Sequence, residues 1–244
     1  MRHGSSFVSI IYEATRRLDR PASGTYHAGR GNRLVASIDD SLRELADVEK
    51  RAIELAKSGH AGSYEHWTVL DTINHACSWK NNALRKVESR LQGEDVRYHS
   101  DKVLDDVNRH YYEKARDYSR SKTIEVAEAA LEKSLNVLGK IRGKESSKDL
   151  APIGYEGAVI EYLTFDLIHH PIAHYAYYAV RNDEYEVFLE IERFVSKRRS
   201  SVFSDLGVVS IKGFADKKTL DGILSKGYEW QHDELFIQIK SMVG

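Results

Sequence analysis

The sequence predicts an all-α protein, and two observations carry this prediction. Apolar residues recur at steps of three and four along several long stretches of the chain, which is the spacing of one face of a helix. The composition, with 41% hydrophobic and 30% charged residues, is that of an ordinary globular protein. We therefore expect residues 34–181 to form a four-helix bundle with an extension at each end.

The two extensions differ in character. Residues 1–33 combine a short apolar stretch with a Gly-rich tail, Gly24 to Gly31, and are expected to form a poorly ordered N-terminal extension. Residues 182–244 are expected to form a C-terminal helical extension packed on the bundle. Asp183 followed by Glu186 resembles a capping box, and the apolar residues beyond it are too many for a free tail. This extension is expected either to cover the open end of a pocket or to form a homodimer contact.

The first two helices of the bundle follow from apolar stripes and stop signals. The first is expected to start at Leu34 and to stop at Gly59. Its apolar positions are Val35, Ile38, Leu42, Leu45, Val48 and Ala52. The second is expected from about Trp67 to Leu91, and it carries His75. Its inward stripe is Val69, Ile73, Ala76, Ala83 and Val87.

The third and fourth helices are less regular. The third region follows Ser100 or Asp101, either of which can cap it, and continues to Leu138 as one helix or as two pieces interrupted at residues 121–123. The fourth is expected from Tyr155 to Val180. Pro171 lies inside it and removes a backbone donor, so we expect a kink there.

Charge and cysteine content exclude several classes of function. Thirty-six basic residues face 37 acidic ones, and no long basic block is available to neutralise nucleic acid. No apolar run has bilayer length and no signal peptide is recognisable, so we expect a cytoplasmic protein without a membrane partner. Cys77 is the only cysteine, which excludes an internal disulfide and a thiolate metal cluster.

Three histidines are candidate ligands for one divalent metal. His170 and His174 are four residues apart, so they share one face of a helix, and His75 lies at the edge of the apolar stripe of another core helix. Three imidazoles with an open position suit zinc, nickel or iron(II). The alternative is that the His170–His174 pair is structural, because spacings of four also arise by chance among 11 histidines.

Two aspartates are candidates for orienting these ligands. Asp71 precedes His75 by four residues, and Asp166 precedes His170 by the same interval. The alternative is that both face water. Tyr162 and Tyr178 lie on the helical face of His170 and are candidates for a pocket wall, with core packing as the alternative.

Three segments of the chain resemble the DinB-like superfamily. The stretch Trp67-Thr-Val-Leu-Asp-Thr-Ile-Asn-His75-Ala-Cys-Ser-Trp79 is similar to its second-helix motif, and His170-Pro-Ile-Ala-His174 matches the paired histidines of its last helix. The stretch Asp106-Val-Asn-Arg-His-Tyr-Tyr112 is similar to the third region of the ClbS/DfsB type. The matches cover about residues 34–181 in the expected order.

The resemblance implies an up-down-down-up four-helix bundle with a divalent metal held by His75, His170 and His174. It also implies a small-molecule substrate, with Trp79, Tyr162 and Tyr178 as candidate pocket residues. Members of the superfamily include transferases and isomerases that depend on a low-molecular-weight thiol such as bacillithiol, mycothiol or glutathione, together with hydrolases. The ClbS/DfsB type includes self-protection proteins that work without metal, so a metal-free binding protein is the alternative function.

Overall fold

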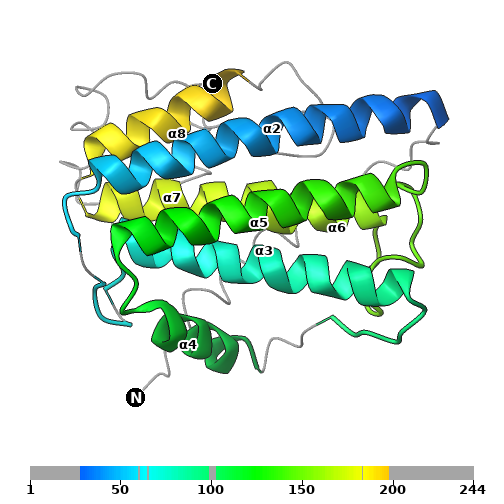
Figure 1. The fold of residues 1–244 in the computed structure, drawn as a ribbon, viewed down its shortest axis with the longest axis horizontal. Coiled ribbons are helices and arrows are strands. Elements are labelled where there is room, and N and C mark those ends of the chain that lie inside the picture. The colour runs from blue at the N-terminus through cyan, green and yellow to red at the C-terminus, as the bar shows by residue number, and fades with distance from the viewer. Residues whose placement is uncertain (1–27, 60, 65, 99–102, 183, 198–244) are drawn as a thin grey trace, which may run out of the picture.

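The computed structural model describes residues 28–59, 61–64, 66–98, 103–182 and 184–197 (Figure 1). Within these ranges the chain is mostly helical, and β-pairing is limited to two isolated bridges. This confirms the predicted all-α class. No helix in the described ranges is long and apolar enough to cross a membrane.

The first described helix, α2, spans Ala28–Leu55 and so begins before the expected start at Leu34. Residues 28–33, which we assigned to the poorly ordered extension, are therefore helical, and residues 1–27 lie outside the described residues. The helix ends at Leu55 rather than at Gly59. The guanidinium of Arg120 donates hydrogen bonds to the carbonyls of Ile53, Glu54 and Ala56, which satisfies backbone acceptors at this helix end.

The second core helix, α3, spans Val69–Leu91, in agreement with the prediction. Thr68 caps its start, since the Thr68 hydroxyl accepts a hydrogen bond from the Asp71 backbone N–H and the Asp71 carboxylate accepts one from the Thr68 backbone N–H. Each residue of the predicted inward stripe is buried. Several polar residues of α3 are buried as well, which shows that other parts of the chain cover this helix on more than one side.

The third region forms two helices, α4 (Leu104–Ala115) and α5 (Arg120–Ile141). The break falls at residues 116–119, before the position we expected, because the Ser119 hydroxyl accepts a hydrogen bond from the Lys122 N–H and caps α5 there. Residues 121–123 therefore lie in the first turns of α5. Helix α4 follows Val103, which makes no side-chain cap, and the expected caps at 100 and 101 lie outside the described residues.

The fourth long helix begins at Val159 rather than at Tyr155 and has three parts, α6 (Val159–Thr164), the π-helical segment η2 (Phe165–His169) and α7 (His170–Arg181). The predicted irregularity at Pro171 takes the form of this wide turn. Proline has no N–H to donate and its ring crowds the carbonyl four residues earlier. At the preceding residue the His170 N–H reaches back five residues to the Phe165 carbonyl, which is the hydrogen bond of a π-helix.

The relative directions of the helices can be followed in Figure 1, and hydrogen bonds and ion pairs between the helices agree with them. Asn74 of α3 pairs with Thr123 near the start of α5, and Glu88 near the end of α3 pairs with Lys140 near the end of α5, so these helices run in the same direction. Arg142, just after α5, pairs with Asp39 of α2. Because Arg120 at the start of α5 contacts the end of α2, these two helices are antiparallel.

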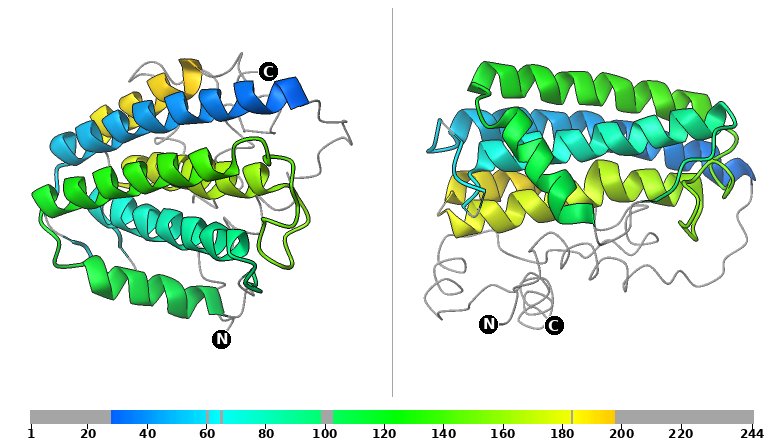
Figure 2. Two further views of the ribbon diagram at one scale, coloured as in Figure 1. Left: turned by 45° about the vertical axis from the view of Figure 1, so that its right-hand side comes forward. Right: turned by 90° about the horizontal axis from the view of Figure 1, so that it is seen from below.

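Helix α7 runs antiparallel to α3 and lies beside it. Asn182, after the end of α7, donates a hydrogen bond to the Trp67 carbonyl just before the start of α3. Helix α4 packs against α3 and lies at the edge opposite to α8 in Figure 1 and in the left view of Figure 2. The histidine-bearing helices α3 and α7 therefore face each other.

Helix α8 (Tyr185–Lys197) packs against α2 and α7 (Figure 2). Its inward residues Val187, Phe188, Ile191 and Phe194 are buried. The Glu184 carboxylate before it accepts a hydrogen bond from the Lys57 N–H after α2. The predicted cap Asp183 and residues 198–244 lie outside the described residues, so only this first part of the C-terminal extension has a described position.

Candidate metal centre

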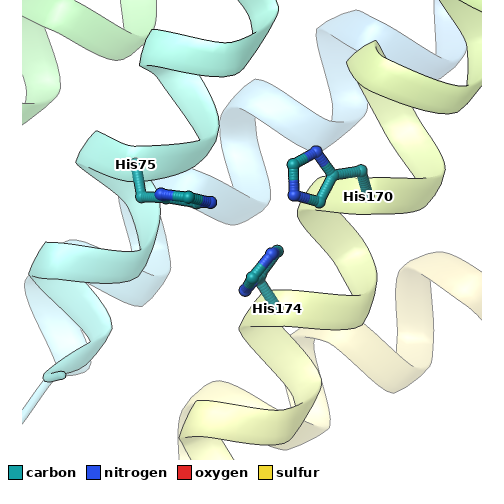
Figure 3. A group of neighbouring side chains, drawn as sticks. All are labelled: His75, His170 and His174. Carbon is teal, nitrogen blue, oxygen red and sulfur yellow. The ribbon is translucent and has the colours of Figure 1, made fainter. Parts of the chain in front are cut away.

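His75, His170 and His174 converge between α3 and α7 (Figure 3). His75 lies in the second turn of α3, His170 is the first residue of α7, and His174 follows one turn later. One ring nitrogen from each histidine can be chosen so that the three lie within 4.8 Å of one another. The sequence-predicted ligands are therefore brought together from two helices that are distant in sequence.

The spacing of the three nitrogens is slightly wider than a closed zinc site requires. With Zn–N distances of about 2.1 Å, tetrahedral ligands lie about 3.4 Å apart. The three imidazole centroids are 4.6 to 5.6 Å apart and the rings are inclined to one another. Rotamer adjustments on the order of 1 Å would close the set on one ion.

Burial keeps His75 in the protonation state that metals bind. All three histidines are buried, and His174 is 0% exposed. Burial, followed by the nearby His170, holds the pKa of His75 well below its usual range. A neutral imidazole is the form that donates a lone pair to a metal.

His75 supplies the clearest chemical argument for a ligand. Neither of its ring nitrogens has a hydrogen-bond partner among the described residues, although the side chain is 2% exposed. A buried polar group without a partner costs about 1–3 kcal/mol. A metal ion between the three rings would satisfy one of these nitrogens, so the residues present fit such an ion.

Asp166 lies where the sequence predicted it, beside His170. Its Oδ1 atom is 3.7 Å from Nδ1 of His170, within ion-pair range but too far for a hydrogen bond. Both side chains are buried. A shift of at most about 1 Å would bring the carboxylate within hydrogen-bond distance of the ring, as expected of a group that orients a ligand.

The predicted pairing of Asp71 with His75 was wrong. Asp71 Oδ2 accepts hydrogen bonds from the backbone N–H groups of Gly62 and Thr68, at 2.7 and 2.8 Å, and from the Thr68 hydroxyl. The start of α3 presents several unsatisfied N–H donors, and the carboxylate in the first turn is closest to them. Asp71 therefore caps α3 and ties it to the preceding loop.

Two of the three predicted pocket residues flank the histidines. The Trp79 ring lies 6.4 Å from that of His75 and 6.1 Å from that of His170, and the Tyr178 ring stacks on His174 at 6.3 Å. Tyr162, the third predicted pocket residue, has ring contacts with other tyrosines. Eight residues of helix separate it from His170, a rise of about 12 Å, and it packs edge-on against Tyr98 and Tyr155.

Sequence reasoning missed two residues beside the site. Trp67, just before α3, places its ring 4.6 Å from that of His75, and Asn108 of α4 accepts a hydrogen bond from the Trp79 indole. Trp67 and Asn108 both lie in the sequence segments 67–79 and 106–112, which the motif comparison had already singled out. Their contacts depend on how the loop before α3 and helix α4 return to the site.

The other described histidines and the cysteine lie outside the cluster. His66 and His110 are exposed, and His232 lies outside the described residues. His169 precedes His170 but is not one of the three converging residues, and burial lowers its pKa to about 4. Cys77 is buried with its pKa raised to about 12 by burial and by the Glu49 carboxylate, so its thiol is neither a ligand nor a nucleophile at neutral pH.

Comparison with known proteins found no match among protein-family models, curated proteins or solved structures, so the histidine geometry itself is the ground for a functional conclusion.

Proposed function

We propose that this chain binds one divalent metal ion through His75, His170 and His174 and acts as a metal-dependent enzyme on a small molecule. The observation that carries the proposal is the convergence of three buried imidazoles from two helices, with both nitrogens of His75 lacking a hydrogen-bond partner among the described residues. A metal with an open position would polarise a bound substrate or lower the pKa of a bound water or thiol.

The helix directions support a DinB-like bundle as the framework of this site. Helix α2 runs one way, α3 and α5 run the other way, and α7 returns, which is the up-down-down-up order of that superfamily. Zinc, nickel and iron(II) remain the candidate ions, because a set of three imidazole ligands suits each of them.

The reaction class we propose is hydrolysis or transfer to a low-molecular-weight thiol. If the reaction uses a thiol, that thiol must come from solution, because Cys77 is 0% exposed and its pKa is raised to about 12. Comparing the metal-loaded protein with and without glutathione, bacillithiol or mycothiol separates the two reactions.

A metal-free small-molecule binding protein is the second candidate function. The observation that favours it is that the ring nitrogens lie within 4.8 Å of one another, a limit wider than the spacing in a closed zinc site, which also suits histidines that hydrogen-bond to a ligand. Metal content and turnover distinguish the two functions.

The test of the proposal is metal binding by the full chain. Elemental analysis of protein purified without added metal and calorimetric titration with zinc, nickel and iron(II) are expected to give one ion per chain. His75→Ala, His170→Ala and His174→Ala should each weaken binding at least 100-fold, because the remaining pair cannot enclose the ion.

The matched control is His169→Ala. This residue adjoins His170 but lies outside the converging set, so the variant should keep wild-type metal affinity. Absence of binding to the wild type for every metal would refute the metal-dependent function and leave the metal-free one. Equal losses in His169→Ala and His170→Ala would refute the assignment of ligands.

A further inference from the structure

Two buried N–H groups beside the histidines have no acceptor in the described part of the chain. They are the indole Nε1 of Trp67 and the carboxamide Nδ2 of Asn108. Trp67 is 3% exposed and Asn108 is 0% exposed, so bulk water does not satisfy them. A buried donor without an acceptor costs free energy, and such groups in native proteins require an explanation.

The orientation of the Asn108 amide is fixed by its neighbour. Nε1 of Trp79 is 2.9 Å from the amide oxygen of Asn108. An indole nitrogen can only donate, so the Asn108 atom that faces it must be the oxygen. The NH₂ group consequently points away from Trp79 with its donors unused.

Each of the two donors belongs to a residue beside the histidine cluster. Trp79 follows His75 by one turn of α3, its ring lies 6.1 Å from that of His170, and its indole N–H is hydrogen-bonded to Asn108. Trp67 precedes α3, and its ring lies 4.6 Å from His75 and 6.3 Å from His174. The arrangement is a histidine cluster flanked by two N–H donors from separate segments.

We propose that Trp67 and Asn108 form an oxygen-binding subsite, in which their N–H groups donate hydrogen bonds to the carbonyl or carboxylate oxygens of the substrate. This inference rests on the proposed function and deepens it by naming the substrate class. Two donors and a cation share one preference, which is for an electron-rich oxygen. The substrate is therefore a small molecule with a carbonyl-type group next to the reacting position.

The test uses the zinc-loaded full chain and benzohydroxamic acid, whose oxygens can occupy both a metal position and a donor position. Trp67→Phe keeps the aromatic ring and removes only the N–H. Asn108→Asp keeps an acceptor for Trp79 and replaces the NH₂ donor by an oxygen. Calorimetry should show that each variant weakens probe binding about 10-fold, or about 1.4 kcal/mol, with zinc affinity changed less than 3-fold.

Asn82→Asp is the matched control. Asn82 is also a buried asparagine of this region, and its amide oxygen accepts a hydrogen bond from Arg85. The Asn82→Asp variant should bind the probe as the wild type does. Benzoate and benzamide then distinguish the two oxygen classes. Both should lose affinity in Trp67→Phe, and the one that binds the wild type more tightly identifies the favoured class.

The outcomes separate this inference from the metal proposal. If zinc binds normally and both variants bind all three probes with wild-type affinity, or the wild type binds none of them, the subsite is refuted while the metal site stands. If zinc does not bind, the metal proposal fails. The subsite is then supported if Trp67→Phe weakens probe binding to the metal-free protein and refuted if it does not.

Discussion

Two buried polar clusters involve the same pair of helices, α3 and α7, and they differ in how their polar atoms are satisfied. In one, the Lys80 ammonium and the Tyr175 hydroxyl both donate to the Glu49 carboxylate of α2, and all three residues are at most 4% exposed. In the other, His75 has no hydrogen-bond partner for either ring nitrogen among the described residues.

The two clusters lie close together in sequence but on different faces. Lys80 follows His75 by five residues, which places the two side chains about 140° apart around α3. Tyr175 immediately follows His174 on α7. The same helices therefore present one face on which the buried charges are paired within the protein, and another face on which the His75 nitrogens have no partner among the described residues.

The comparison suggests how to separate structural from functional buried polar groups. A charge cluster that pairs its own members stabilises one packing of α2, α3 and α7 and needs no ligand to explain it. A cluster that leaves buried nitrogens unpaired lowers stability, and a bound ion or substrate accounts for it. Five measurements would test this distinction.

The largest expected effect is that of Glu49→Ala. Removing the carboxylate leaves the Lys80 ammonium buried and unpaired, and we expect a loss of about 3–5 kcal/mol in unfolding free energy. Urea denaturation measures it. The double variant Glu49→Leu/Lys80→Met should recover most of the loss, and failure to do so would mean that Glu49 has a role besides pairing.

Zinc should stabilise the wild type through the histidine cluster. A ligand present at 100 times its dissociation constant raises the unfolding free energy by about 2.7 kcal/mol when it binds only the native state. Thermal denaturation with and without zinc should show this gain in the wild type and in Glu49→Gln, but not in His170→Ala. An equal gain in His170→Ala would place the zinc elsewhere.

Tyr175→Phe should have an intermediate effect. It removes one hydrogen bond to the buried Glu49 carboxylate, 2.5 Å long, and keeps the packed ring. Hydrogen bonds to charged groups contribute about 1.5–3 kcal/mol, so we expect a loss of about 2 kcal/mol without a change in zinc affinity. Reduced zinc affinity would show that the two clusters are coupled through α7.

The metal-free protein should lose stability in mild acid. Burial lowers the pKa of His75 well below 6.5 and that of His169 to about 4. Just below pH 6.5 these histidines are therefore protonated in the unfolded chain but still neutral in the folded one. The unfolding free energy is highest above about pH 6.5, the pKa in the unfolded chain. It falls by about 1.4 kcal/mol per pH unit for each such group as the pH decreases toward the pKa in the folded chain. His169→Gln should reduce this slope by one proton between about pH 6.5 and 4, measured by urea denaturation across that range.

The smallest effect is expected for His75→Leu in the metal-free protein. The substitution removes two buried nitrogens that lack partners among the described residues and puts an apolar side chain of similar size in their place, so the unfolding free energy should change by less than about 1 kcal/mol. The same variant should abolish zinc binding. A loss of several kcal/mol in unfolding free energy would mean that His75, like Glu49, has a structural role.

The sequence by itself determined the features that depend on local helical geometry. The apolar stripe of α3 follows from 3.6 residues per turn, and so does the shared face of His170 and His174. The third histidine could be added because His75 lies at the edge of a buried stripe on a second helix. These relations survive any arrangement of the helices, and for that reason they could be predicted without one.

Tertiary structure alone decided which neighbours complete the site. Asp71 lies at the right sequence interval to orient His75. Its carboxylate instead accepts hydrogen bonds from backbone N–H groups at the start of α3 and in the preceding loop. Trp67 and Asn108 reach the histidines because a loop and α4 fold back onto α3, whereas the rise along the fourth helix carries Tyr162 away. Such contacts depend on the offset and packing of separate segments, which helical periodicity does not specify.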